Sequence, residues 1–218
     1  MSEVLGTLVK GRFITFEGVE GSGKSTNIAW AADYLRSAGI EVLQTHEPGR
    51  TKIGEELRTV LLRTRDERLM PMTELFLMFA SRMQLLEEVI IPALIRGTWV
   101  LCDRYVDSSI AYQGGGRALG VERVKTLIRA MGDRYAEPDL TVLLDIPPIV
   151  IPDRLADRPL DRFESEETSF FERIRQTYLE LAAEEPRIEV IDATLPLKSI
   201  QEQIAVLLDV LVNESSNE

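Results

Sequence analysis

The sequence predicts an α/β fold, a three-layer sandwich in which a five-stranded parallel sheet lies between layers of helices. Two observations support this fold class. Short apolar runs alternate with longer amphipathic segments, which is the pattern of βαβ units. The apolar runs also contain few polar positions, as expected of parallel strands that helices cover on both faces.

The five runs that are rich in β-branched or aliphatic residues are the predicted strands, at residues 12–17, 40–45, 98–103, 140–146 and 187–192. Helices are predicted where apolar residues recur every three or four positions. These segments are 24–37, 53–63, 72–96, 121–133, 168–184 and 197–212. Residues 1–10 and 213–218 lack a clear pattern, so we expect both ends to fray.

The chain of 218 residues is predicted to form one domain, residues 1–218, because this length can bury a sufficient core and no run resembles a linker. The formal net charge of −11 disfavours a nucleic-acid polymer as partner, since binding a polyanion depends on many Lys or Arg contacts. A small phosphorylated ligand is compatible with this charge if arginines gather locally.

Cysteine content and hydropathy favour the cytoplasm. Cys102 is the single cysteine, so no intramolecular disulfide can form, and the N-terminus lacks the pattern of a secretory signal. No apolar stretch approaches the roughly 20 residues that cross a bilayer. We therefore expect a cytoplasmic protein without a membrane partner.

The strongest functional signal is the segment Gly18-Val19-Glu20-Gly21-Ser22-Gly23-Lys24-Ser25, which fits G-x-x-x-x-G-K-[ST] between a strand and a helix. In this motif Lys24 reaches the β- and γ-phosphates, Ser25 ligates Mg²⁺, and we expect Lys24 to face solvent in the empty loop. The alternative is a structural turn, and the strand and helix around it argue against that. The fold is therefore predicted to be of the P-loop NTPase type. The residues expected to bind the nucleotide phosphates are Gly18, Glu20, Gly21, Ser22, Gly23, Lys24, Ser25 and Thr26.

Asp103 and Arg104 lie at the end of the predicted third strand, and parallel sheets place their ligands beyond the carboxyl ends of strands. Asp103 is positioned to hold Mg²⁺ or its water shell, and Arg104 to neutralise a phosphate. The alternative is a surface ion pair without a functional role, which would contribute little to stability.

The remaining arginines are ambiguous from the residues alone. Arg154, Arg158 and Arg162 recur at helical spacing, which fits a solvated basic face as well as a site that an anion holds together. Arg82 lies on an apolar helical face beside Phe79. Its guanidinium could bind a planar base, or its stem could cover apolar surface while its head reaches water.

Taken together, these residues resemble a thymidylate kinase of the bacterial type, within the P-loop nucleoside monophosphate kinases. The resemblance covers the chain from Arg12 to about Val212. It implies transfer of the γ-phosphate of ATP to dTMP with Mg²⁺, in pyrimidine deoxynucleotide synthesis, by a homodimer. The matching landmarks are Gly18 to Thr26, Glu47-Pro48-Gly49, the helix of Arg82, Asp103-Arg104-Tyr105, Ser108 to Gln113, Gly114-Gly115-Gly116-Arg117, Asp161-Arg162-Phe163-Glu164, Tyr178-Leu179 and Ile191-Asp192-Ala193.

The resemblance also implies roles for single residues. Glu20 receives the 3′-hydroxyl of the acceptor, Arg104 binds the acceptor phosphate, and Arg82 binds the thymine edge. A short mobile lid at about residues 152–165 supplies arginines to the transferred phosphoryl group. The predicted substrate-binding residues are Glu20, Glu47, Phe79, Arg82, Arg104, Ser109, Tyr112 and Gln113, with Tyr112 excluding a 2′-hydroxyl. The predicted catalytic residues are Lys24, Arg104, Arg158 and Arg162, and the predicted metal ligands are Ser25 and Asp103.

Four positions depart from the family pattern. His46 replaces an Arg, Arg50 replaces a Gly, Met78 stands where a base-stacking Phe is common, and Ile151-Pro152 replaces Gly-Leu before a lid that is one residue shorter. A P-loop kinase for another nucleoside monophosphate or a small metabolite is therefore the alternative function. A nucleotide-dependent interaction protein without turnover is a third hypothesis.

Overall fold

The computed structural model describes residues 11–64, 66–155 and 161–215. Its centre is a single parallel sheet with the strand order β2-β3-β1-β4-β5. The strands are β1 (Phe13–Glu17), β2 (Val42–His46), β3 (Trp99–Asp103), β4 (Leu140–Asp145) and β5 (Ile188–Asp192). The five predicted strands and the α/β class are confirmed, with boundaries shifted by no more than two residues.

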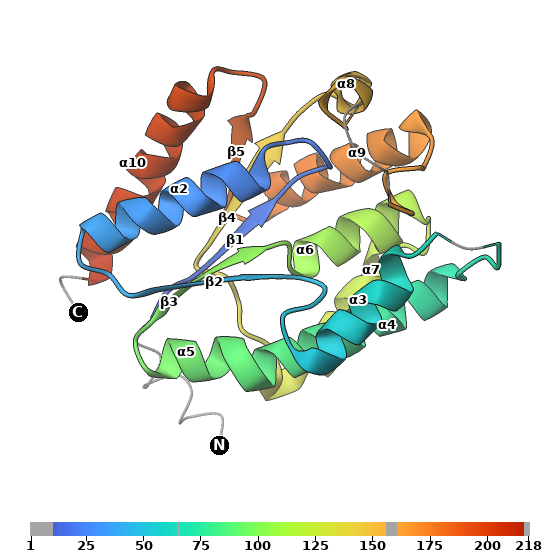
Figure 1. The fold of residues 1–218 in the computed structure, drawn as a ribbon, viewed down its shortest axis with the longest axis horizontal. Helices are drawn as coiled ribbons and strands as arrows, with labels where there is room; N and C mark the ends of the chain where they lie inside the picture. Colours follow the sequence, from blue (N-terminus) through green and yellow to red (C-terminus); the bar gives the residue numbers. More distant parts are fainter. Residues whose placement is uncertain (1–10, 65, 156–160, 216–218) are drawn as a thin grey trace.

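Helices cover both faces of this sheet (Figure 1). On one face α2 (Lys24–Ser37) packs beside α10 (Leu197–Ser215). On the other, α5 (Ile91–Ile95) contacts β3 and α9 (Thr168–Glu184) contacts β5. The helix α3 (Lys52–Leu62) packs against α4 (Pro71–Leu85). In this arrangement the start of α2 lies at the carboxyl end of β1, the central strand of the sheet.

The long helix predicted at residues 72–96 is interrupted. A π-helical turn, η1 (Leu86–Ile90), separates α4 from α5. Pro92 follows it, and a proline lacks the N–H that would bond to the preceding turn. A π turn absorbs such a defect without ending the helix, so the chain continues in nearly the same direction.

The structure adds a helical segment after β3 that the sequence pattern did not predict. It consists of α6 (Val106–Ser109) and the π-helical η2 (Ile110–Gly116), and α7 (Val121–Ala130) and η3 (Gly132–Arg134) follow. Its glycines permit close packing on α9. A Cβ on Gly115 would lie 2.1 Å from Thr177 Oγ1, and one on Gly116 would lie 2.6 Å from the Phe170 ring.

The C-terminal half carries the remaining corrections. Pro152 lies in the first turn of α8 (Ile151–Leu155), which follows η4 (Pro148–Val150), and a first turn tolerates proline. Fraying was predicted from residue 213, but α10 continues to Ser215, whose hydroxyl accepts a hydrogen bond of 3.1 Å from Arg12 Nε. Among the described residues, no helix is both long and apolar enough to cross a membrane.

Candidate active site

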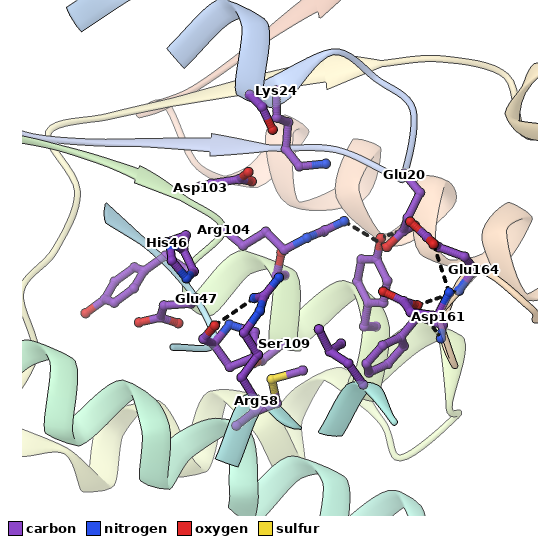
Figure 2. Close-up of a pocket in the computed structure, with 18 of the residues that line it drawn as sticks. Glu20, Lys24, His46, Glu47, Arg58, Asp103, Arg104, Ser109, Asp161 and Glu164 are labelled. Carbon is purple, nitrogen blue, oxygen red and sulfur yellow. Dashed lines mark hydrogen bonds and ion pairs between the residues drawn. The ribbon is translucent and has the colours of Figure 1, made fainter. Parts of the chain in front are cut away.

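A cavity of about 670 Å³ opens at the carboxyl ends of β1, β2 and β3. Figure 2 shows side chains from several elements around this space, with Arg104 reaching toward Glu20. Most residues predicted from the sequence line the cavity. They are Glu20, Gly21, Gly23, Lys24, Ser25, Thr26, Glu47, Arg82, Asp103, Arg104, Ser109, Tyr112 and Gln113.

The loop between β1 and α2 depends on glycine. Gly18, Gly21 and Gly23 have φ values of 132°, 74° and 89°, a region that residues with a side chain rarely adopt. A Cβ on Gly18 would also lie 2.4 Å from Leu144 O. This conformation turns the backbone into the N-terminus of α2, where unpaired N–H groups attract an anion.

Lys24 does not face solvent as predicted. Its side chain is buried, and Nζ donates to Gly18 O at 2.9 Å and Val19 O at 3.0 Å. Burial lowers its pKa from 10.5 to about 8, and the nearby charge of Arg104 adds to this shift. The ammonium therefore donates to backbone carbonyls, which a phosphate oxygen can replace.

Asp103 and Ser25 were predicted to hold Mg²⁺, and both line the cavity. Asp103 Oδ1 is buried and has no hydrogen-bond partner within the described part of the chain. Within that part, no group of three or more His, Cys, Asp or Glu residues could hold a metal ion. One carboxylate and one hydroxyl fit Mg²⁺, because this ion keeps several waters and takes further ligands from substrate phosphates.

Arg104 connects the two ends of the site. Its backbone has φ 68°, and its guanidinium donates to Glu20 Oε1 at 2.9 Å and Ser108 Oγ at 3.2 Å. The guanidinium also lies 4.7 Å from the centre of the Tyr112 ring, whose hydroxyl donates to Glu20 Oε2 at 2.7 Å. Glu20, Arg104 and Tyr112 thus form one group between the loop and the segment after β3.

Below this group lies Glu17, a buried carboxylate that sequence analysis did not single out. It accepts hydrogen bonds from the backbone N–H of Tyr105 at 2.7 Å, from the Ser108 hydroxyl and from Tyr178 Oη at 2.7 Å. Burial, and secondarily the charge of Asp107, raises the pKa of Glu17 to about 7. The carboxylate ties the end of β1 to the segment that carries Arg104.

Arg82 forms the wall at α4 and is buried, with a side-chain exposure of 2%. Its Nε donates to Glu47 Oε2 at 2.7 Å, and NH2 donates to Tyr105 O at 2.9 Å and Ser109 Oγ at 3.0 Å. Phe79 was predicted to bind substrate, but it does not line the cavity and instead packs against the Arg82 guanidinium at 4.8 Å. Met78 lines the cavity.

The lid arginines take different places. Arg154 lines the cavity and donates to Gly21 O at 2.9 Å and Ala193 O at 3.0 Å. Arg162 does not line it, since its Nε donates to Leu61 O at 2.8 Å and its NH1 pairs with Glu74 at 2.7 Å. Arg158 lies outside the described residues. Of the two described lid arginines, Arg154 and Arg162, it is therefore Arg154 that contacts the loop.

The other departures from the family pattern lie beside the cavity. His46 lines it and contacts Glu55 Oε1 at 3.3 Å. Arg50 has φ 73°, a backbone conformation suited to glycine, and its N–H also donates to Glu55. Arg58 lines the cavity and donates to Pro48 O at 2.7 Å, although no motif in the sequence singles it out.

Fold and site together define a P-loop phosphotransferase of the nucleotide kinase class. A phosphate-binding loop, a carboxylate at the end of β3 and several arginines surround one cavity large enough for the reacting ends of two substrates. A family model described as thymidylate kinase matches residues 16–204. The chain belongs to the thymidylate kinase family.

Curated relatives agree over almost the whole length. The chain is 48% identical to a thymidylate kinase of Alcanivorax borkumensis over 203 residues, which are 92% of this chain and 97% of the relative. The identity to the thymidylate kinase of Thiobacillus denitrificans is 49%, over 91% of this chain and 96% of the relative. For that of Bordetella pertussis it is 50%, over 89% and 93%.

Proposed function

We propose that this protein transfers the γ-phosphate of ATP to dTMP and forms dTDP. The observation that carries the proposal is one cavity with a phosphate-binding loop at one end and the buried Arg82 at the other. Arg104 lies between them and faces the loop through Glu20. The chain's membership of the thymidylate kinase family supports the same reaction, because the similar curated proteins are thymidylate kinases.

On the donor side, the loop from Gly18 to Thr26 would bind the ATP phosphates through backbone N–H groups at the start of α2. Lys24 would exchange its two carbonyl partners for β- and γ-phosphate oxygens. Ser25 and Asp103, whose Oδ1 has no hydrogen-bond partner among the described residues, would hold Mg²⁺. The ion supplies neutralisation of the charge on the phosphate oxygens when it is bound.

On the acceptor side, Arg104 would bind the phosphate of dTMP and Glu20 its 3′-hydroxyl. Tyr112, whose ring packs on Arg104, would lie near the sugar and exclude a 2′-hydroxyl. Arg82, Ser109 and Gln113 would meet the base, and Glu47 would hold Arg82 in place. Phosphoryl transfer then needs in-line positioning and no strong base, because the acceptor oxygen is already anionic.

In the lid, Arg154 is the arginine whose contacts with the loop support a role with the transferred phosphoryl group. Arg158 and Arg162 remain catalytic candidates. Arg162 would have to leave Glu74 and Leu61 to reach that group, which requires a second position of its side chain.

We also propose that the protein acts in the cytoplasm as a homodimer. Cys102 is buried and unpaired, which fits a reducing compartment. Phe76 on α4 and Val60 on the adjacent α3 expose 55% and 38% of their surface, and a second copy would cover them. Light scattering of wild type and Phe76→Glu tests the dimer, since a monomeric wild type would contradict it.

The reaction is tested by ADP release with ATP and each common nucleoside monophosphate. We expect the highest kcat/KM with dTMP. A higher value with another monophosphate would replace dTMP as the acceptor. Binding of ATP without turnover of any acceptor would favour an interaction protein instead.

A further inference from the structure

We propose that Glu74, a buried carboxylate behind the cavity wall, fixes the orientation of the Gln113 side-chain amide and thereby selects acceptor bases that carry an N–H beside a carbonyl. The inference rests on the proposed function, because it concerns the base of the acceptor in the same site. Glu74 does not line the cavity and acts through Gln113, so it is a positioning residue.

The Glu74 carboxylate contacts the donor side chains of three residues in different parts of the chain. It lies in the first turn of α4, and its side chain has no exposed surface. Its Oε1 accepts a hydrogen bond from Gln113 Nε2 at 2.8 Å, and its Oε2 pairs with Arg162 NH1 at 2.7 Å. Arg117 Nε donates to both oxygens, at 3.3 and 3.2 Å. A carboxylate between two guanidinium groups can only accept hydrogen bonds.

This environment leaves the Gln113 amide one favourable orientation. Its NH₂ end must face Glu74, because the flipped amide would place its carbonyl oxygen against a carboxylate oxygen. Gln113 lines the cavity with 1% exposure, and its Oε1 has no hydrogen-bond partner in the described part of the chain. An unmet buried acceptor is costly, so a ligand that donates a hydrogen bond there is favoured.

Arg82 supplies the complementary group on the same wall. Its NH1 is also buried without a partner among the described residues, while its NH2 is fixed on Ser109, one turn before Gln113. The wall thus offers one donor and one acceptor. Thymine and uracil present a carbonyl at C4 beside an N–H at N3, which matches both. Cytosine presents an amino group and a bare nitrogen, so donor meets donor and acceptor meets acceptor.

Glu74→Gln tests this coupling. The new side chain keeps its shape but can donate as well as accept, so Gln113 loses its single favourable orientation. We expect kcat/KM for dTMP relative to dCMP to fall at least about tenfold, mainly through KM for dTMP. Glu74→Asp keeps the charge and should retain more of the selectivity. The ratio of dTMP to dUMP should stay constant, because both bases share the recognised edge.

Glu166→Gln is the matched control. Glu166 pairs with NH1 of the same Arg117, whereas Gln113 donates to Glu74. Its substitution removes a neighbouring carboxylate without changing what Gln113 contacts. We therefore expect the dTMP to dCMP ratio of wild type. An equal loss of selectivity in Glu166→Gln and Glu74→Gln would overturn the inference.

A second measurement uses the wild-type protein and covers a Glu74 variant that fails to fold. Calorimetry should show that dTMP methylated at N3 binds at least about tenfold more weakly than dTMP, because the methyl group removes the donor. Equal binding of the two ligands, or wild-type selectivity in Glu74→Gln, overturns the role of Glu74. Wild type that prefers another monophosphate refutes the proposed function itself, so the two failures are distinguishable.

Discussion

Removal of the Glu47 carboxylate should destabilise the fold strongly. The Arg82 and Glu47 side chains are 2% and 4% exposed and join at 2.7 Å, so Glu47→Ala leaves the Nε of a buried guanidinium without its partner. Arg82 would keep its NH2 bonds to Tyr105 and Ser109. Breaking a buried pair from one side costs about 3–5 kcal/mol. For a chain of this size, that corresponds to a fall in Tm of roughly 6–20 °C.

Urea unfolding and thermal melting, followed by circular dichroism, measure this cost. The control is Asp33→Ala, which removes one partner of the exposed pair Arg36–Asp33, with side-chain exposures of 45% and 79%. Such a pair contributes about 1 kcal/mol or less. If Glu47→Ala costs no more than Asp33→Ala, burial does not make the Arg82 pair important and the reasoning is refuted.

Three further predictions concern the catalytic end of the site. Lys24→Met should lower kcat about 100-fold or more with the fold retained by circular dichroism, and near-normal turnover would contradict the role of the loop. Glu17 has a pKa raised to about 7 in the folded state, so it lowers stability as pH rises from about 4.5 to 7. Between pH 5 and pH 8 the free energy of unfolding, measured with urea, should therefore fall less for Glu17→Gln than for wild type. An equal fall in both proteins would contradict this. Arg154→Ala should lower kcat more than it raises KM for dTMP, and an unchanged kcat would return this arginine to a structural role.

The fold was largely predictable because its signals are local. Strands buried on both faces read as apolar runs, and the glycine-rich loop marks where β1 ends and α2 begins. The helix after β3 was missed because η2 contains three glycines, which local propensity disfavours in a helix. Tertiary packing decides there, since α9 lies too close to Gly115 and Gly116 for any side chain.

The site was predictable where a residue adjoins a motif, and not where its role depends on a partner far along the chain. Lys24 begins α2, Asp103 ends β3 and Arg104 follows it, and all three line the cavity. Glu17 and Glu74 gave no signal, because their partners are separated from them by 39 to 161 residues. Lys24 was predicted to be exposed because the sequence does not show that loop carbonyls would hold its ammonium.

The partly buried Glu20 carboxylate also explains how a chain with net charge −11 holds an arginine in position for a phosphate. Arg104 pairs with Glu20 at 2.9 Å, so the positive charge of this arginine is compensated within the site. On the proposed function, dTMP brings an anionic phosphate for Arg104 and a 3′-hydroxyl that can donate to Glu20. One ligand thus replaces both halves of the ion pair at once, and neither charge is left buried alone. A free phosphate ion replaces only one half, which favours a complete nucleotide over its fragments.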